Sequence, residues 1–66
     1  MIPKYPNIKV KLTGQDGNAF MVLALVKRGL TKAKVPAAEI KAFMDEAMSG
    51  DYDNLLQTAM KWVDVT

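Results

Sequence analysis

The chain contains no cysteine and no histidine, and only five of its 66 residues are aromatic. Without cysteine there is no disulfide framework, no thiolate nucleophile and no zinc site with sulfur ligands. Without histidine the chain lacks the commonest general base and the commonest neutral metal ligand. We therefore expect a protein that is not an enzyme and that carries neither a metal nor another cofactor.

Long apolar runs are also missing. The longest, residues 19–26, has eight residues, whereas a membrane-spanning helix needs about 20. The run does not fit a signal peptide, because it is followed directly by Lys27 and Arg28 rather than by small residues suited to cleavage. We expect a soluble cytoplasmic protein without membrane contact.

The chain is long enough for one small domain over residues 1–66. Half of its residues are apolar, which excludes a disordered chain. A domain of this size buries only about 60% of the surface that its unfolded chain exposes. Because disulfides are unavailable, we expect tight side-chain packing or self-association to supply the remaining stability.

The hydrophobic pattern predicts an α+β fold that is mostly helical. After an extended lead-in over residues 1–7, residues 8–12 alternate apolar and basic, as in a strand with one buried face. Residues 63–66 alternate and include three β-branched side chains, which predicts a short closing strand. It would pair with the first strand, whose alternative partner is the same strand of another subunit. Between the strands we expect three helices, over residues 18–30, 36–49 and 51–63.

Turn and capping residues mark the ends of these helices. Asp16 and Gly17 belong to the turn before the first helix, which Asn18 is expected to cap. Gly50 is expected to end the second helix in the left-handed conformation, and Asp51 to cap the third. Neither the turn before the first helix nor the segment around Gly50 and Asp51 matches a phosphate-binding loop or a calcium-binding loop. We interpret these five residues as structural.

The first helix is apolar nearly all round over residues 19–26. Such a helix is buried on several sides. Two arrangements would bury it in so short a chain. Either it lies centrally beneath the other elements, or part of it faces another subunit, which favours a homo-oligomer.

The charges divide unevenly between the two halves of the chain. Residues 1–34 carry seven basic side chains and one acidic, a net charge of +6, and residues 35–66 carry two basic and six acidic, a net charge of −4. This division favours an acidic partner for the first half, such as a nucleotide or nucleic acid, or contact between opposite faces of two copies. The alternative is ordinary solvated lysines around a helix end. The candidate binding residues are Lys9, Lys11, Lys27 and Arg28.

Two strings of residues resemble a known group of proteins. Residues 12–20, LTGQDGNAF, and residues 49–56, SGDYDNLL, with Trp62 beyond them, are similar to short proteins encoded by bacteriophages, plasmids and related mobile elements. The resemblance covers about residues 8–66. It implies a small accessory protein inside a bacterial cell, with no catalytic or binding residues carried over. Accessory proteins of this size usually act by binding, often by blocking or sequestering a host component.

Three functions follow as expectations. The leading one is a non-enzymatic interaction protein, a homo-oligomer that binds and modulates or blocks a host or phage protein. The alternative is a sponge that sequesters a phosphate-bearing nucleotide signal of host defence, in grooves lined by Lys9, Lys11, Lys27 or Arg28. The third is weak nucleic-acid binding, for which Lys9 and Lys11 near Tyr5 come closest to basic residues interleaved with aromatic ones.

Overall fold

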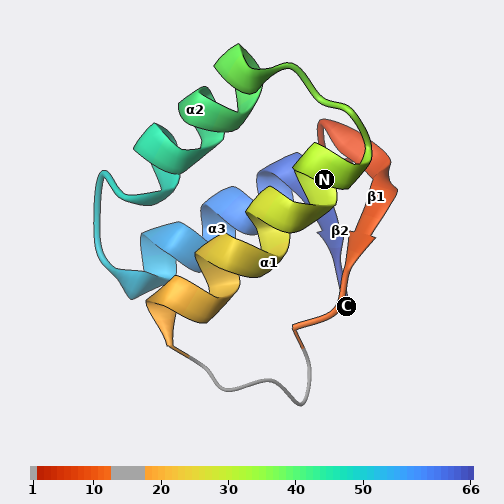
Figure 1. The fold of residues 1–66 in the computed structure, drawn as a ribbon. Coiled ribbons are helices and arrows are strands. Elements are labelled where there is room, and N and C mark those ends of the chain that lie inside the picture. Colours follow the sequence, from red (N-terminus) through yellow and green to blue (C-terminus); the bar gives the residue numbers. More distant parts are fainter. Residues whose placement is uncertain (1, 13–17) are drawn as a thin grey trace.

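Two short strands from opposite ends of the chain lie side by side and point the same way, next to a group of helices (Figure 1). The computed structural model describes residues 2–12 and 18–66. The elements in chain order are β1 (Tyr5–Val10), α1 (Ala19–Lys32), α2 (Ala37–Ala47), α3 (Tyr52–Trp62) and β2 (Val63–Val65). The prediction of a mostly helical α+β fold is confirmed, and β2 pairs with β1 of the same chain.

The first strand lies earlier in the chain than expected. β1 begins at Tyr5, inside the segment interpreted as a lead-in, and ends at Val10 rather than at residue 12. Its start is held by β2, because Tyr5 is in register with Val63 and the Lys4 N–H donates to the Lys61 carbonyl at 2.8 Å. A proline at residue 6 is tolerated because a two-stranded sheet consists of edges, where a strand can lack an N–H donor.

The alternation along β1 orients its side chains as predicted. Val10 is buried and Ile8 is half-buried, whereas Lys9 between them is exposed. The buried side of β1 lies against α1 at Gly29, where an added Cβ would be 3.2 Å from a methyl carbon of Ile8 and from one of Val10. The missing side chain at residue 29 therefore allows the helix to approach the strand.

The first helix begins as predicted and ends two residues later. The Met21 N–H donates to the Asn18 side-chain oxygen at 2.8 Å, which confirms the cap. The helix continues past its predicted end at residue 30 to Lys32, and it is closed by Lys34 in the left-handed conformation with a φ of 63°. The N–H groups of Lys34 and Val35 donate to the carbonyls of Thr31 and Leu30. This pair of bonds is the Schellman arrangement that satisfies terminal carbonyls.

The second and third helices are each slightly shorter than predicted. Asp51 caps α3 as expected, since its side-chain oxygen accepts from the Asn54 N–H at 2.9 Å. The prediction for Gly50 was wrong, because its φ lies outside the left-handed region and α2 already ends at Ala47. A Cβ at Gly50 would instead lie 3.0 Å from that of Asn54, so the glycine makes room for the start of α3. Asp16 and Gly17 lie outside the described residues.

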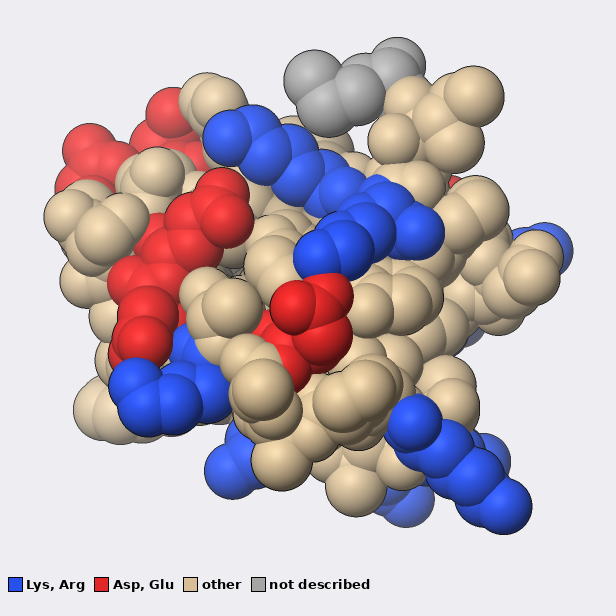
Figure 2. Space-filling model, turned by 90° about the horizontal axis from the view of Figure 1, so that it is seen from above, with Lys and Arg blue, Asp and Glu red and all other residues tan. Residues whose placement is uncertain are grey.

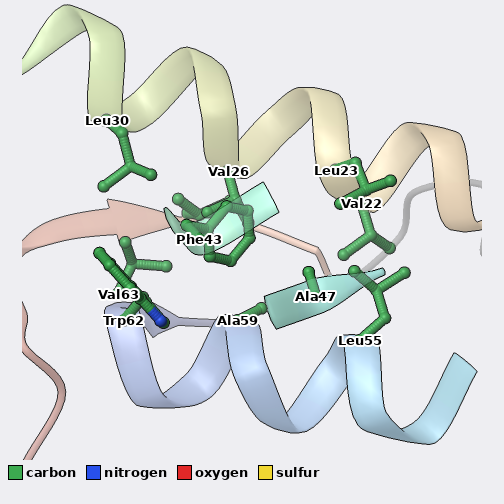
Figure 3. Close-up of a cluster of buried hydrophobic side chains, with 11 residues drawn as sticks. Val22, Leu23, Val26, Leu30, Phe43, Ala47, Leu55, Ala59, Trp62 and Val63 are labelled. Carbon is green, nitrogen blue, oxygen red and sulfur yellow. The ribbon is translucent and has the colours of Figure 1, made fainter. Parts of the chain in front are cut away.

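The core lies between α1 on one side and α3 on the other, with Phe43 of α2 between them (Figure 3). Phe43 and Val26 are fully buried. The expectation that α1 is buried on several sides was wrong: Val22, Leu23, Val26 and Leu30 are buried, whereas Phe20 and Ala24 are exposed. α1 lies at one side of the core rather than beneath the other elements. The buried apolar residues are Val10, Val22, Leu23, Val26, Leu30, Phe43, Ala47, Leu55, Ala59, Trp62 and Val63.

Candidate functional site

The four predicted binding residues do not form one site within the chain. Lys9 and Lys11 are exposed on β1 and just beyond it. Because Ile8 and Val10 face α1, Lys9 lies on the opposite side of the strand. Lys27 and Arg28 are exposed on α1, near its C-terminal end. The structure therefore separates the basic candidates into two pairs on different faces.

The basic pair on α1 belongs to a shallow part of the surface. Lys27 and Arg28 line a hollow of about 420 Å³ together with Ala24, Thr31 and Lys32. A second hollow of about 570 Å³ lies between α1 and α2, with Lys27 and Lys41 among its lining residues. Lys41 is also paired with Asp45 at 2.9 Å, as the spacing of four residues predicts. The basic residues that border the first hollow all lie on α1. In the second hollow, Lys41 already forms an ion pair with Asp45.

A cluster of charged and aromatic side chains joins β1 to α2 and α3, and its assembly does not follow from the sequence pattern. Lys4 forms an ion pair with Glu39, which also accepts a hydrogen bond from the Tyr5 hydroxyl at 3.1 Å. The Tyr5 ring stacks on Trp62 with 6.0 Å between ring centroids. Hydrogen bonds from Lys4 and then Tyr5 lower the pKa of Glu39 below its ordinary value. We call Lys4, Tyr5, Glu39 and Trp62 the clasp.

The Trp62 indole also connects the clasp to the end of α2. The indole N–H donates to Glu46 at 3.3 Å, and the Lys61 ammonium lies 3.7 Å from the same carboxylate. Each charged group of the clasp has a partner of opposite sign, so the cluster is a structural tie rather than a vacant site. On the face seen in Figure 2, blue and red side chains meet near the middle, and further red ones gather to the left.

The strongest candidate for binding is an apolar surface at the opposite end of the helices. Phe20 at the start of α1 is 85% exposed, Met48 after α2 is 57% exposed and Tyr52 at the start of α3 is 41% exposed. These three residues line one hollow of about 300 Å³. We call this region the end surface; its lining residues are Ala19, Phe20, Leu23, Ala47, Met48, Gly50, Asp51, Tyr52 and Leu55.

The end surface arises because three helix termini meet there. α1 and α3 begin at it and α2 ends at it, so Phe20, Met48 and Tyr52 lie within a residue or two of a helix boundary. The floor consists of residues that also belong to the core, such as Leu23 and Leu55. The side chains above that floor are exposed because no further element of the described chain covers this end of the core.

Acidic groups border the end surface, and basic ones are distant in the sequence. Asp51 lines the hollow, and Asp53 is exposed in the first turn of α3. Residues 18–26 and 42–60, which supply the end surface and the segments around it, contain neither lysine nor arginine. The basic residues of α1 all lie in its C-terminal half. The end surface is therefore apolar and acidic, in contrast to the basic end of α1.

The sequence contained a partial signal for this surface. Phe20 lies in the run of residues 19–26 that was expected to be buried on several sides. The structure exposes Phe20, because the start of α1 lies at the edge of the core. Only the exposure of part of the first helix could be inferred beforehand, through the alternative that some of it faces another protein.

Neither a membrane-spanning helix nor a metal-binding cluster is found in the described part of the chain. None of the helices over residues 18–66 combines the length and apolar character needed to cross a bilayer. Among residues 2–12 and 18–66, acidic side chains do not gather in threes in a way that could hold a metal ion.

Comparison with known proteins adds no assignment. No protein-family model matches the chain, and neither the curated proteins nor the solved structures include a significant match. The function is therefore argued from the geometry of the end surface.

Proposed function

We propose that the protein is a non-enzymatic interaction protein that binds another polypeptide through the end surface. The observation that carries the proposal is the exposure of Phe20, Met48 and Tyr52 around one hollow with an apolar floor. Aromatic residues and methionine are enriched at protein interfaces and in their energetic centres. Methionine adapts its shape readily to a partner. In the setting implied by the sequence resemblance, the partner is a host or phage protein that the binding modulates or blocks.

The test compares two exposed apolar residues at different places. Phe20→Ser removes the most exposed large apolar residue of the end surface, and Met60→Ser removes a residue on α3 that is 53% exposed and does not line the hollow. Tagged wild type and both variants are used to isolate partners from a bacterial lysate. Each retained polypeptide is identified by mass spectrometry, produced separately and titrated against the three proteins.

The proposal predicts a purified partner that binds the wild type and Met60→Ser and loses at least tenfold in affinity for Phe20→Ser. A partner that binds all three proteins equally contradicts it. The absence of a Phe20-dependent polypeptide also overturns it. So does co-purification of a nucleotide or nucleic acid whose retention requires Lys27 and Arg28 but not Phe20.

The nucleotide sponge has less support than the interaction protein. Lys9 and Lys11 lie on a different face from Lys27 and Arg28, so a groove that combined them would have to form between chains. Self-association stays a prediction, with a narrower basis than before. Because the chain itself buries Val22, Leu23, Val26 and Leu30 of α1, Phe20 is the large apolar residue of this helix left for another subunit.

A further inference from the structure

We infer that the end surface selects a basic amphipathic segment, one that places an apolar side chain in the hollow and lysine or arginine beside Asp51 and Asp53. This inference rests on the proposed function and names the chemistry of the partner. It is argued from the size of the hollow, the exposed residues around it and the charges at its border.

The hollow has the size for a side chain rather than for a large ligand. Its volume of about 300 Å³ lies at the lower limit of pockets that hold small molecules. The floor, formed by residues such as Leu23, Ala47 and Leu55, offers no charged group. An apolar side chain that enters it would be removed from water, which favours binding. Phe20, Met48 and Tyr52 can then close around that anchor.

The charges at the border favour a cationic partner. The carboxylates of Asp51 and Asp53 accept hydrogen bonds from the Asn54 N–H and the Gln57 amide. These bonds leave their negative charge in place, and among the ion pairs of the described residues neither carboxylate has a basic partner. Opposite charges at an interface rim raise the association rate and exclude partners of the wrong sign.

The helix dipoles do not reverse this preference. The N-termini of α1 and α3 each present about half a positive elementary charge to the end surface, and the C-terminus of α2 presents about half a negative one. Their sum is about +0.5, against two full negative charges from Asp51 and Asp53. The end surface therefore keeps a net negative potential, which repels an acidic peptide or a nucleic acid.

The experiment uses three synthetic peptides of one length that share the same leucine and phenylalanine anchors. Their charged positions are all lysine, all glutamine or all glutamate, and binding to the full chain is measured by fluorescence anisotropy at low and high salt. The double variant Asp51→Asn with Asp53→Asn removes both charges, and Asn keeps the capping role at residue 51. Asp45→Asn with Asp64→Asn is the matched control, because it removes two charges away from the hollow.

We expect the lysine peptide to bind the wild type most tightly and the glutamate peptide most weakly. The Asp51/Asp53 variant should bind the lysine peptide about tenfold less tightly, a difference of about 1.4 kcal/mol, because it loses two exposed charge pairs. The control variant should change the affinity less than twofold. The inference is overturned if the three peptides bind alike or if both double variants behave alike. It is also overturned if the wild type, in sedimentation without peptide, dimerises through Phe20.

The result separates the inference from the proposed function. Phe20→Ser should weaken the binding of both the lysine peptide and the isolated partner. If binding of the partner depends on Phe20 but not on the charges of Asp51 and Asp53, the proposed function stands and the inference is wrong. If Phe20→Ser changes neither the peptides nor the partner, both are wrong.

Discussion

The ammonium nitrogen of Lys4 lies 4.4 Å from the centroid of the Trp62 indole ring, although the two residues come from opposite ends of the chain. A cation over an indole face is attracted by the ring quadrupole. Lys4 also forms an ion pair with Glu39 of α2. This contact and the pairing of β1 with β2 tie the N-terminal segment to α2, α3 and the chain end. The clasp thus links the N-terminal segment to both α2 and α3.

Stability should fall in acid because Glu39 must accept a proton. Hydrogen bonds from Lys4 and Tyr5 hold the pKa of Glu39 below its ordinary value of 4.5. A lowered folded-state pKa contributes stability that is present above the unfolded value and is lost as the pH falls through the folded one. We expect Glu39→Gln to lower the melting temperature at neutral pH and to make the loss between pH 5 and 2, about the range for a shifted carboxyl, shallower than in the wild type.

The measurement follows unfolding by the fluorescence of Trp62, the single tryptophan. Asp45→Asn is a suitable control, because its carboxylate takes part in an exposed pair with Lys41 outside the clasp. Identical acid profiles for Glu39→Gln and the wild type would show that the clasp does not contribute to the pH dependence.

The same substitution should cost much more stability at one phenylalanine than at the other. Phe43 is fully buried, whereas Phe20 is 85% exposed. Phe43→Ala should cost about 3–5 kcal/mol, because it removes core contacts and leaves a cavity. Phe20→Ala should change the free energy of unfolding by less than about 0.5 kcal/mol. Urea denaturation of both variants checks this prediction, and a cost above 1 kcal/mol at Phe20 would contradict its exposed position.

Replacing Lys34 by glycine should stabilise the protein. Lys34 occupies the left-handed region with a φ of 63°, a conformation that costs an L-residue about 1–2 kcal/mol and glycine almost nothing. After allowing for the greater freedom of glycine in the unfolded chain, we expect Lys34→Gly to gain about 0.5–1 kcal/mol. Lys34→Ala removes the charge and keeps the strained backbone, so it should show no gain. Equal stabilities of the two variants in thermal unfolding would exclude backbone strain as the cause.

A larger side chain at Gly29 should force α1 away from β1. A Cβ there would lie 3.2 Å from methyl carbons of both Ile8 and Val10. We expect Gly29→Ala to be nearly neutral, because a gain in helix propensity of about 1 kcal/mol offsets the crowding. Gly29→Val should cost about 1–3 kcal/mol more than Ala24→Val, which makes a β-branched residue at an exposed position of the same helix. Equal costs for the two valine variants in urea would contradict the close approach.

The helix starts could be predicted because each depends on neighbouring residues alone. Asn18 and Asp51 accept hydrogen bonds from N–H groups three residues further on, and such bonds need no distant partner. The end of α1 was predicted less well. The predicted end at residue 30 is two residues early, because α1 continues to Lys32. The true stop at Lys34 carries a residue that seldom adopts a left-handed backbone.

The candidate site was only partly predictable, because it depends on contacts between distant parts of the chain. The sequence marked the first helix as too apolar for its surroundings, but not which residue would stay uncovered. Lys9 and Arg28 were grouped by their charge, and the fold placed them on different faces. The clasp was not foreseen, since its members come from three parts of the chain, which the parallel pairing of β1 with β2 and the packing of α2 against α3 bring together.

Residue order by itself determined the helical periodicity, the strand alternation and the helix caps of this protein, because those interactions act within about one turn or one pleat. It also determined the absence of cysteine and histidine chemistry. Tertiary structure alone decided the parallel strand pair, the clasp and the convergence of Phe20, Met48 and Tyr52 at one end. These features depend on how the helices cross and where the core ends, and no interaction between sequence neighbours specifies that arrangement.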